Sequence, residues 1–435
     1  MSVTIRNYYC KDTEEEAVET IVMTTYINNV LMFPDKTNIT KLIITKAGKN
    51  GSDEDADAIC SCPLAAQLDC PLLTVQSNST TLPEKVEAFI GSIPSGKLDT
   101  VYIVGGTSSV QDDIIGDSSN YTIKEYIVEG VVIGSEYTLK SGHTESNTSK
   151  LLHYCSTIKR LYGGDRYNTS AAVAYELRKV KSNTNPMRLF YCYGLDMADG
   201  YCISAAACRL KEPLLFMPEE EPDPNTIYGQ YIRAVKGSIK KVFITGGGQR
   251  VFIETSKRLQ NILELTMPNC IERIAGRDRL DTSLSIAKEF RDYLDPSDKH
   301  SIVIINSNAV EVDLPIAGYF AAKKQYPVIL VDMGTIREES IAHPEINSTY
   351  LKFNDYNYDL TPFLLKRLPT NIYLFSNYPI NKVSTARTKN QLDNDLTKKS
   401  LKSFNDLANK YNETVYSKEN NSYSYTIFNN NVNLT

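Results

Sequence analysis

The chain has 435 residues, a formal net charge of -5 and no tryptophan, with 42% hydrophobic and 23% charged residues. This composition is typical of a globular protein with several domains and excludes a fibrous or disordered chain. No Lys/Arg block dominates any region, which argues against nucleic acid as a partner. No apolar run approaches the roughly 20 residues of a membrane-spanning helix, so we expect no membrane insertion.

The N-terminal stretch MSVTIRNYYCKDTEEE lacks the basic start and the apolar segment of about 7–15 residues that mark a secretory signal. We therefore expect folding in the cytoplasm and a final site in a virion or tail-like particle or at the cell surface. Nine cysteines without a CxxC pair and four scattered histidines predict no metal site. We expect no cofactor, and we expect cysteines in apolar segments, such as Cys70 and Cys192, to be buried.

The first set of predicted elements begins with the apolar strand KLIIT. An alanine-rich helix from Asp57 follows, then a strand after Pro71, a helix over residues 82–90 and a strand over 100–104 that enters a glycine turn. The segment 123–142 alternates apolar and polar residues around glycines, which predicts a β-hairpin. Strands that alternate with helices indicate parallel sheets.

The same order of elements returns twice. The second set has a helix after Asp165, strands over 187–194 and 214–217 around the Asp199 helix, a helix over 225–235, a strand over 242–245 and a helix over 252–263. The third set has a helix after Asp278, strands over 301–306 and 327–331 around the Asp313 helix, a helix near 360–368 and the strand NIYLF.

Three 20-residue segments, which start at Ala56, Ala198 and Val312, match one another without a gap. Each has Asp at its second position, Ala at its tenth and Pro at its sixteenth, which are Asp57, Asp199 and Asp313; Ala65, Ala207 and Ala321; and Pro71, Pro213 and Pro327. Such a match indicates a triplicated α/β unit of about 113 residues. We expect three tandem Rossmann- or flavodoxin-like modules with parallel sheets in a pseudo-threefold arrangement, over 1–157 with a hairpin insertion at about 117–157, 158–270 and 271–383, and a polar C-terminal arm over 384–435.

The motifs RLYGGDRYNTSAAVA, RIAGRDRLDTSLSIA, PLAAQLDCPLL and VYIVGGTSSV closely resemble the cell-wall-binding repeats of type 2, which occur in tandem triplets on clostridial surface proteins. The resemblance extends from about residue 40 to residue 383. It implies three small α/β units about a pseudo-threefold axis that hold an anionic secondary polymer of the Gram-positive wall without catalysis. It also associates polymer anchoring with the apolar stretch after each Pro, here Leu72 and Leu73, Leu214 and Leu215, and Val328, Ile329 and Leu330.

The repeated aspartates are candidate ligand-binding residues. Asp57, Asp199 and Asp313 are expected at helix starts on the carboxyl edge of each sheet, where open α/β folds bind ligands. Capping of the helix is the alternative role of each carboxylate. No His, Ser or Cys stands at a spacing that suggests a nucleophile with its base, so we expect no enzymatic activity.

Glycine turns and two arginines complete the candidate site. The turns, at Gly105–Gly106 and Gly246–Gly247, could bind an anion through backbone N–H groups or serve only as tight turns. Two arginines each precede a helix and could bind a phosphate or carboxylate, or pair with an acidic group of the neighbouring module. They are Arg166 and Arg279.

The arm over 384–435 is polar and Asn-rich, with a weak amphipathic helix over 401–411 and the β-prone segment YSYTIF. Its apolar positions are too few for a core of its own, so we expect it to contact other protein chains. The sequence thus favours a non-catalytic protein that binds an anionic wall polymer. The alternative is a structural component of a phage virion or tail-like particle that reuses the fold, and a sugar-phosphate-acting enzyme is the third hypothesis.

Overall fold

The computed structural model describes most of residues 29–331 and several separate strands. The described ranges are 2–8, 29–46, 55–96, 98–195, 197–218, 222–247, 253–265, 270–276, 279–298, 301–306, 314–331, 337–343, 346–352, 371–375, 381–385 and 424–429. The helices predicted near 360–368 and over 401–411 lie outside these ranges, as does Asp313.

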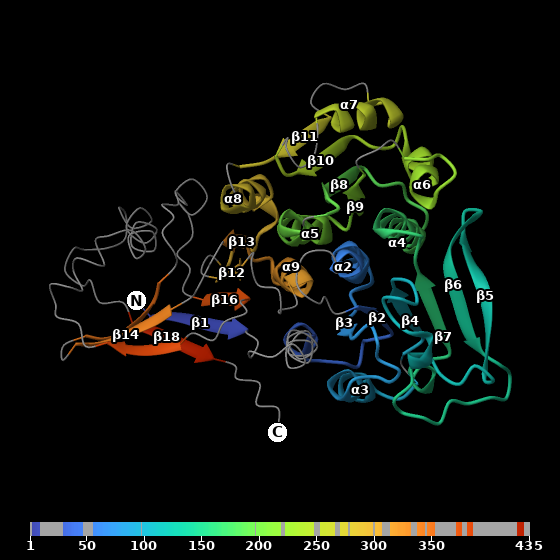
Figure 1. Cartoon of the computed structure of the whole chain (residues 1–435), viewed down its shortest axis with the longest axis horizontal. Helices are drawn as coiled ribbons and strands as arrows, with labels where there is room; N and C mark the ends of the chain where they lie inside the picture. The colour runs from blue at the N-terminus through green and yellow to red at the C-terminus, as the bar shows by residue number, and fades with distance from the viewer. Residues whose placement is uncertain are drawn as a thin grey trace.

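Three sheets share one strand order and surround a central group of helices (Figure 1). The first sheet begins β3-β2-β4-β7, with strands Leu72–Val75, Lys41–Lys46, Thr100–Val104 and Thr157–Leu161. The second has the order β9-β8-β10-β11, with strands Leu214–Met217, Arg188–Tyr193, Lys241–Thr245 and Ile271–Ile274. The third begins β13-β12-β16-β1, with strands Val328–Val331, Ser301–Asn306, Asn371–Phe375 and Ser2–Tyr8.

All pairings between these strands are parallel. Helices cover both faces of such sheets, so their inner strands consist of continuous apolar runs. In β2, for example, the apolar residues from Leu42 to Ile44 are fully buried. The predicted α/β class with three tandem units is therefore confirmed.

Three equivalent helices, α2 (Ala56–Leu68), α5 (Ala198–Leu210) and α9 (Leu314–Lys324), pack against one another at the centre (Figure 1). They are the alanine-rich segments of the repeat. Small side chains allow the close approach: the Cys62 thiol contacts the Pro315 carbonyl oxygen at 3.6 Å. A side chain at Gly318 would overlap Ser204 Oγ of the neighbouring helix.

Polar contacts tie the central helices together at both ends. The Tyr201 hydroxyl of α5 donates to Asp55 Oδ2, just before α2, at 2.8 Å. At the carboxyl ends, Arg209 donates to the carbonyl oxygen of Tyr326, and Lys323 pairs with Asp69.

Two helices pass from one sheet to the next. Helix α4 (Arg166–Val180) follows β7 of the first sheet and packs against β9 of the second and against α2. Helix α8 (Arg279–Glu289) follows β11 of the second sheet and packs against β13 of the third and against α5. The strand before each of these helices therefore belongs to the preceding sheet. The predicted module boundaries at 158 and 271 remain predictions.

The remaining helices connect strands within the units. The predicted connecting helices are present as α3 (Glu84–Gly91), α6 (Ile227–Val235) and α7 (Ile253–Ile262). Single 3-10 turns, which were not predicted, lie at η1 (Asp112–Ile114), η2 (Leu151–His153) and η3 (Arg291–Tyr293).

The predicted hairpin is present as β5 (Tyr121–Val128) and β6 (Val131–Leu139), which pair in antiparallel fashion. Strand β6 also pairs with β7, again antiparallel, so the hairpin extends the first sheet by two strands. This hairpin contains most of the extra length of the first unit.

The N-terminal strand completes the third sheet. Strand β1 pairs with β16 and takes the place that β7 and β11 hold in the other two sheets. Strand β18 (Ser424–Asn429) pairs in parallel with the other side of β1. The β-prone end of the predicted arm thus contacts its own chain, and contact of the arm with another chain remains a prediction.

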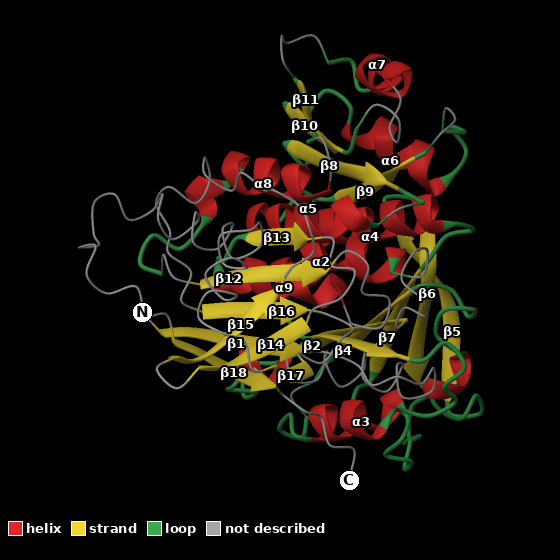
Figure 2. Ribbon diagram, turned by 60° about the vertical axis from the view of Figure 1, so that its left-hand side comes forward, coloured by secondary structure: helices red, strands yellow, loops and turns green. Residues whose placement is uncertain are grey.

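A small sheet that the sequence did not predict lies against β18. Its order is β15-β14-β17, with strands Ile346–Lys352, Arg337–His343 and Asn381–Thr385. Figure 2 shows these strands beside the third sheet, in which β13, β12 and β16 lie side by side.

Candidate functional site

Asp57 lies in the first turn of α2, at the carboxyl end of the first sheet. The residue that begins the helix is Asp55, and Asp57 instead accepts a hydrogen bond of 2.8 Å from Ser109 Oγ. Ser109 belongs to the loop after β4, so this contact joins two neighbouring strand-to-helix connections. The carboxylate of Asp57 is therefore part of a small polar cluster, and helix capping is not its role.

Burial raises the pKa of Asp57 above its ordinary value. Three interactions oppose this effect: the Ser109 hydrogen bond and the positive charges of Lys46 and Arg166. Lys46 ends β2, whereas Arg166 begins α4, so the two cations approach the carboxylate from different elements.

Arg166 lies at the junction of the first and second units. Helix α4 is begun by Asp165, whose carboxylate accepts from the backbone N–H of Asn168 at 2.7 Å. This start directs Arg166 toward the second sheet, where its Nη1 donates to the carbonyl oxygen of Gly194 at 2.5 Å. The guanidinium thus joins the carboxyl edge of one sheet to that of the next.

The glycine turns are held by the strand beside them. Gly105 has a φ of 111°, and its N–H donates to the Leu161 carbonyl oxygen at 2.9 Å. Its own carbonyl oxygen accepts from Arg160 Nη1 at 3.0 Å. A side chain at Gly105 would overlap Asp57 Oδ2. This position therefore requires glycine, and its N–H is already used within the protein.

The turn after β10 repeats this arrangement. Gly246 has a φ of 107°, its N–H donates to the Ile274 carbonyl oxygen at 3.1 Å, and its carbonyl oxygen accepts from Arg273 at 2.9 Å. The second residues of the two turns, Gly106 and Gly247, are partly exposed, and a side chain would meet no atom within 4 Å at either. The tight-turn role thus applies to the first glycine of each pair.

The remaining predicted residues fall into two groups. Asp199 and Arg279 are partly buried and lie at the starts of α5 and α8, the places that Asp57 and Arg166 hold one unit earlier. The apolar residues on the edge strands are core residues with at most 2% of their surface exposed: Leu72, Leu73, Leu214, Leu215, Ile329 and Leu330.

Sequence reasoning missed Arg160 and Arg273, which hold the glycine turns. Arg160 is 1% exposed, and its Nη2 also donates to Asp112 Oδ1 at 2.8 Å. Arg273 Nη2 donates instead to Ser256 Oγ at 2.8 Å. Both arginines stand in the same place of the quoted motifs RLYGG and RIAGR, so their register was the available signal.

The cysteines behave as the sequence predicted. Those in the described ranges are reduced and buried. Over the same ranges, no three His, Cys, Asp or Glu side chains are grouped so that they could hold a metal ion. None of the helices described is long and apolar enough to cross a membrane.

Comparison with known proteins gives one family. The model of cell wall binding domain 2 matches the chain three times, over residues 17–115, 160–253 and 273–361. Over 181 residues the chain is 24% identical to the N-acetylmuramoyl-L-alanine amidase LytC of Bacillus subtilis (strain 168), a match that covers 42% of this chain and 32% of the amidase.

Two solved structures share the fold. Cwp8 from Clostridium difficile has a TM-score of 0.57 and 19% identity, over 94% of this chain and 52% of that protein. Cwp6 from the same organism has a TM-score of 0.57 and 17% identity, over 89% of this chain and 49% of that protein. The chain thus spans about half the length of these structures and about a third of the amidase.

Proposed function

The chain belongs to the cell wall binding domain 2 family, and from that premise we propose that it binds an anionic secondary polymer of the Gram-positive wall without catalysis. The proposed site is the junction of the first and second units, at the carboxyl edges of their sheets. The corresponding junction of the second and third units, with Asp199, Gly246, Gly247 and Arg279, is proposed to bind the same polymer.

One observation carries this proposal: two cations, Lys46 and Arg166, lie near the carboxylate of Asp57. A protein with a net charge of -5 repels a polyanion at long range, so binding requires a local excess of positive charge. The junction brings two cations from different elements together on partly buried groups, where salt screens an interaction less than it does in water.

The apolar edge strands serve this site indirectly. Leu72 and Leu73 are at most 1% exposed and cannot contact a polymer directly. We propose that they, and their equivalents in β9 and β13, fix the edge strands whose carboxyl ends form the site. Substitution there would then weaken binding through the fold.

The test is retention of the chain on purified clostridial walls, with and without their anionic polymer. Arg166→Ala should weaken retention at least about tenfold, because a hydrogen bond to a charged group contributes about 1.5–3 kcal/mol. Arg233→Ala is the matched control, since it removes one positive charge from the exposed side of α6. Binding of the wild-type chain should also weaken as salt rises.

Equal retention on stripped and intact walls would contradict the polymer hypothesis. It would leave a structural role, for which a component of a phage virion or tail-like particle is the alternative. Equal losses for Arg166→Ala and Arg233→Ala would show that net charge matters and that the junction is not the site.

A further inference from the structure

The second sheet is the one of the three equivalent sheets whose fourth strand is uncovered in the described residues. The fourth strand is β7 in the first sheet, β11 in the second and β1 in the third. Strand β6 pairs with β7, and β18 pairs with β1. Strand β11 ends its sheet. The molecule thus covers this edge twice with a further strand and leaves it open once.

The open edge carries backbone groups that can bind another strand. The N–H groups of Val242 and Gly246 in and after β10 donate to the carbonyl oxygens of Cys270 and Ile274, at 2.7 and 3.1 Å. Because backbone groups alternate in direction along a strand, those of Ile271 and Arg273 face away from β10. An edge strand of this kind is a template for strand addition.

The equivalent groups of the first sheet show what such an edge binds. Ile158 and Arg160 stand 113 residues before Ile271 and Arg273. Strand β6 lies opposite them in antiparallel register. A glycine, Gly134, lies opposite Leu161, and a side chain there would overlap the Arg160 carbonyl oxygen. A strand on this edge therefore needs a glycine at the corresponding place.

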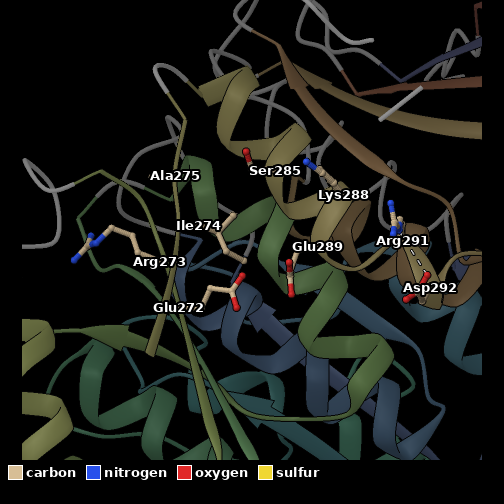
Figure 3. A pocket seen from close by; sticks show the side chains of 9 residues that line it. All are labelled: Glu272, Arg273, Ile274, Ala275, Ser285, Lys288, Glu289, Arg291 and Asp292. Carbon is tan, nitrogen blue, oxygen red and sulfur yellow. Dashed lines mark ion pairs between the residues drawn. The ribbon is translucent and has the colours of Figure 1, made fainter. Parts of the chain in front are cut away.

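A pocket of about 400 Å³ lies beside the open edge, between β11 and α8. Figure 3 shows that the side chains of Glu272 and Glu289 point toward each other within it. Lys241 pairs with Glu272 at 2.6 Å. Partial burial and the neighbouring Glu272 carboxylate raise the pKa of Glu289, although Lys241 and Arg291 oppose this effect. The two carboxylates therefore repel each other when both are ionised.

In the first unit the hairpin covers the equivalent place, and a lysine offsets the charge of the buried carboxylate there. Glu176 is the equivalent of Glu289, and Lys159 stands where Glu272 does. Glu176 accepts hydrogen bonds from Tyr102 at 2.9 Å and from Tyr126 of the hairpin at 2.7 Å, with Lys159 Nζ at 3.9 Å.

The second unit has none of these three groups. Phe243 takes the place of Tyr102, and Glu272 takes the place of Lys159. Between β10 and β11 the described residues form helix α7 and no hairpin.

In the first unit the hairpin needs to supply only the neutral Tyr126 hydroxyl, because Lys159 already offsets the charge of Glu176. In the second unit, Lys241 and Arg291 act on Glu289, yet its pKa stays raised beside Glu272, so a further cation from an incoming hairpin would be favourable.

We propose that the edge of β11 binds a β-hairpin of a partner protein. The inner strand of that hairpin adds to the sheet antiparallel, as β6 does on β7, with a glycine opposite Ile274. Its outer strand, the counterpart of β5, places a Lys or Arg side chain between Glu272 and Glu289, at the position that Tyr126 holds in the first unit. Main-chain hydrogen bonds supply affinity, and the basic side chain supplies specificity.

The probe is a cyclised, fluorescent peptide of residues 121–139 of this chain that carries Tyr126→Lys. Its binding to the full-length chain is measured by fluorescence anisotropy. Ile271→Pro should weaken binding at least tenfold, because it removes an outward N–H while an edge strand tolerates proline at such a place. Ile271→Val retains the N–H and should bind as the wild type does.

Charge specificity is tested with Glu272→Gln and Glu289→Gln together. This double variant should weaken binding of the lysine peptide more than binding of the unsubstituted tyrosine peptide. If Ile271→Pro does not fold, this double variant still tests the proposal. A second measurement is hydrogen exchange of the wild-type chain, in which added peptide should slow exchange of the Ile271 and Arg273 amides. Wall retention should be unchanged in every variant, which separates this site from the polymer site.

Three results would overturn the proposal. The first is equal peptide binding by the Ile271→Pro and wild-type chains. The second is that the lysine peptide does not bind at concentrations up to about 1 mM, which corresponds to a binding free energy less favourable than about -4 kcal/mol. The third is self-association of the chain that Ile271→Pro abolishes, which would assign the edge to a second copy.

Discussion

The Tyr126 hydroxyl donates a hydrogen bond of 2.7 Å to Oε2 of Glu176 and so joins the hairpin β5–β6 to helix α4. Glu176 is fully buried, and Tyr102 donates to its other oxygen. A buried carboxylate requires such donors, because loss of its hydration is otherwise uncompensated. The hairpin therefore stabilises the first unit through this contact as well as through strand pairing.

Replacing Tyr126 by Phe should lower the free energy of unfolding by about 1.5–3 kcal/mol, the usual contribution of a hydrogen bond to a charged group. Urea unfolding followed by circular dichroism measures the change. The control is Tyr293→Phe, since Tyr293 is 40% exposed and its hydroxyl can bond to water. Equal losses in the two variants would show that the Glu176 contact contributes nothing specific.

Arg160 and Arg273 offer an internal comparison. Arg160→Ala should cost about 2–3 kcal/mol, because the side chain is 1% exposed and donates to both Gly105 and Asp112. Arg273→Ala should cost about 1 kcal/mol, because Arg273 is more exposed and its acceptors are neutral. Denaturant midpoints of the two variants decide the order, and a reversed order would contradict it.

The two glycines of the first turn should respond differently to substitution. Gly105→Ala should destabilise the protein by about 1–3 kcal/mol, since the φ of 111° disfavours a side chain and the added Cβ would overlap Asp57. Gly106→Ala should have little effect, because no atom lies within 4 Å of its added Cβ. Thermal melting of both variants tests this difference, and equal melting temperatures would refute it.

Asp57→Asn should stabilise the protein at pH 7. Burial raises the pKa of Asp57 in the folded state, so the folded protein binds this proton more tightly than the unfolded chain does. The stability from Asp57 is therefore fully present below its unfolded pKa and is lost as pH rises through the folded pKa.

An Asn at this position cannot ionise, and it can still accept a hydrogen bond from Ser109. The gain in melting temperature should thus be larger at pH 7 than at pH 4. A gain that does not change with pH would show that the Asp57 charge carries no cost. A loss at pH 7 would show that Lys46 and Arg166 outweigh the effect of burial.

Hydrophobic pattern predicted the inner elements of each unit but not the fourth strands. The segments TIKRL and IERI are short and each has two adjacent charged residues between apolar ones, so they do not stand out as buried strands. Their place in the sheets became clear only from pairing with β4 and β10. The N-terminal strand was missed for the same reason.

The candidate site was predicted in part. Asp57, Gly105 and Arg166 come from separate segments of the chain, and the structure brings them to one junction. The interactions that define their chemistry were not predicted, because Ser109 and Lys46 have no distinctive spacing relative to Asp57. The apolar residues after each Pro were placed correctly on strands, but their burial shows that they hold the fold.

The amino-acid sequence by itself determined the triplication, because matching side chains recur at the same positions of three segments and local pattern sets helices and strands. Tertiary structure alone decided which edges of the sheets are covered. Strand β1 pairs with β16 although the two strands lie far apart in the sequence. Strand β11, in contrast, has no strand beyond it in the described residues. The physical reason is that backbone N–H and C=O groups are the same in every residue, so the choice of a neighbouring strand depends on how distant segments pack.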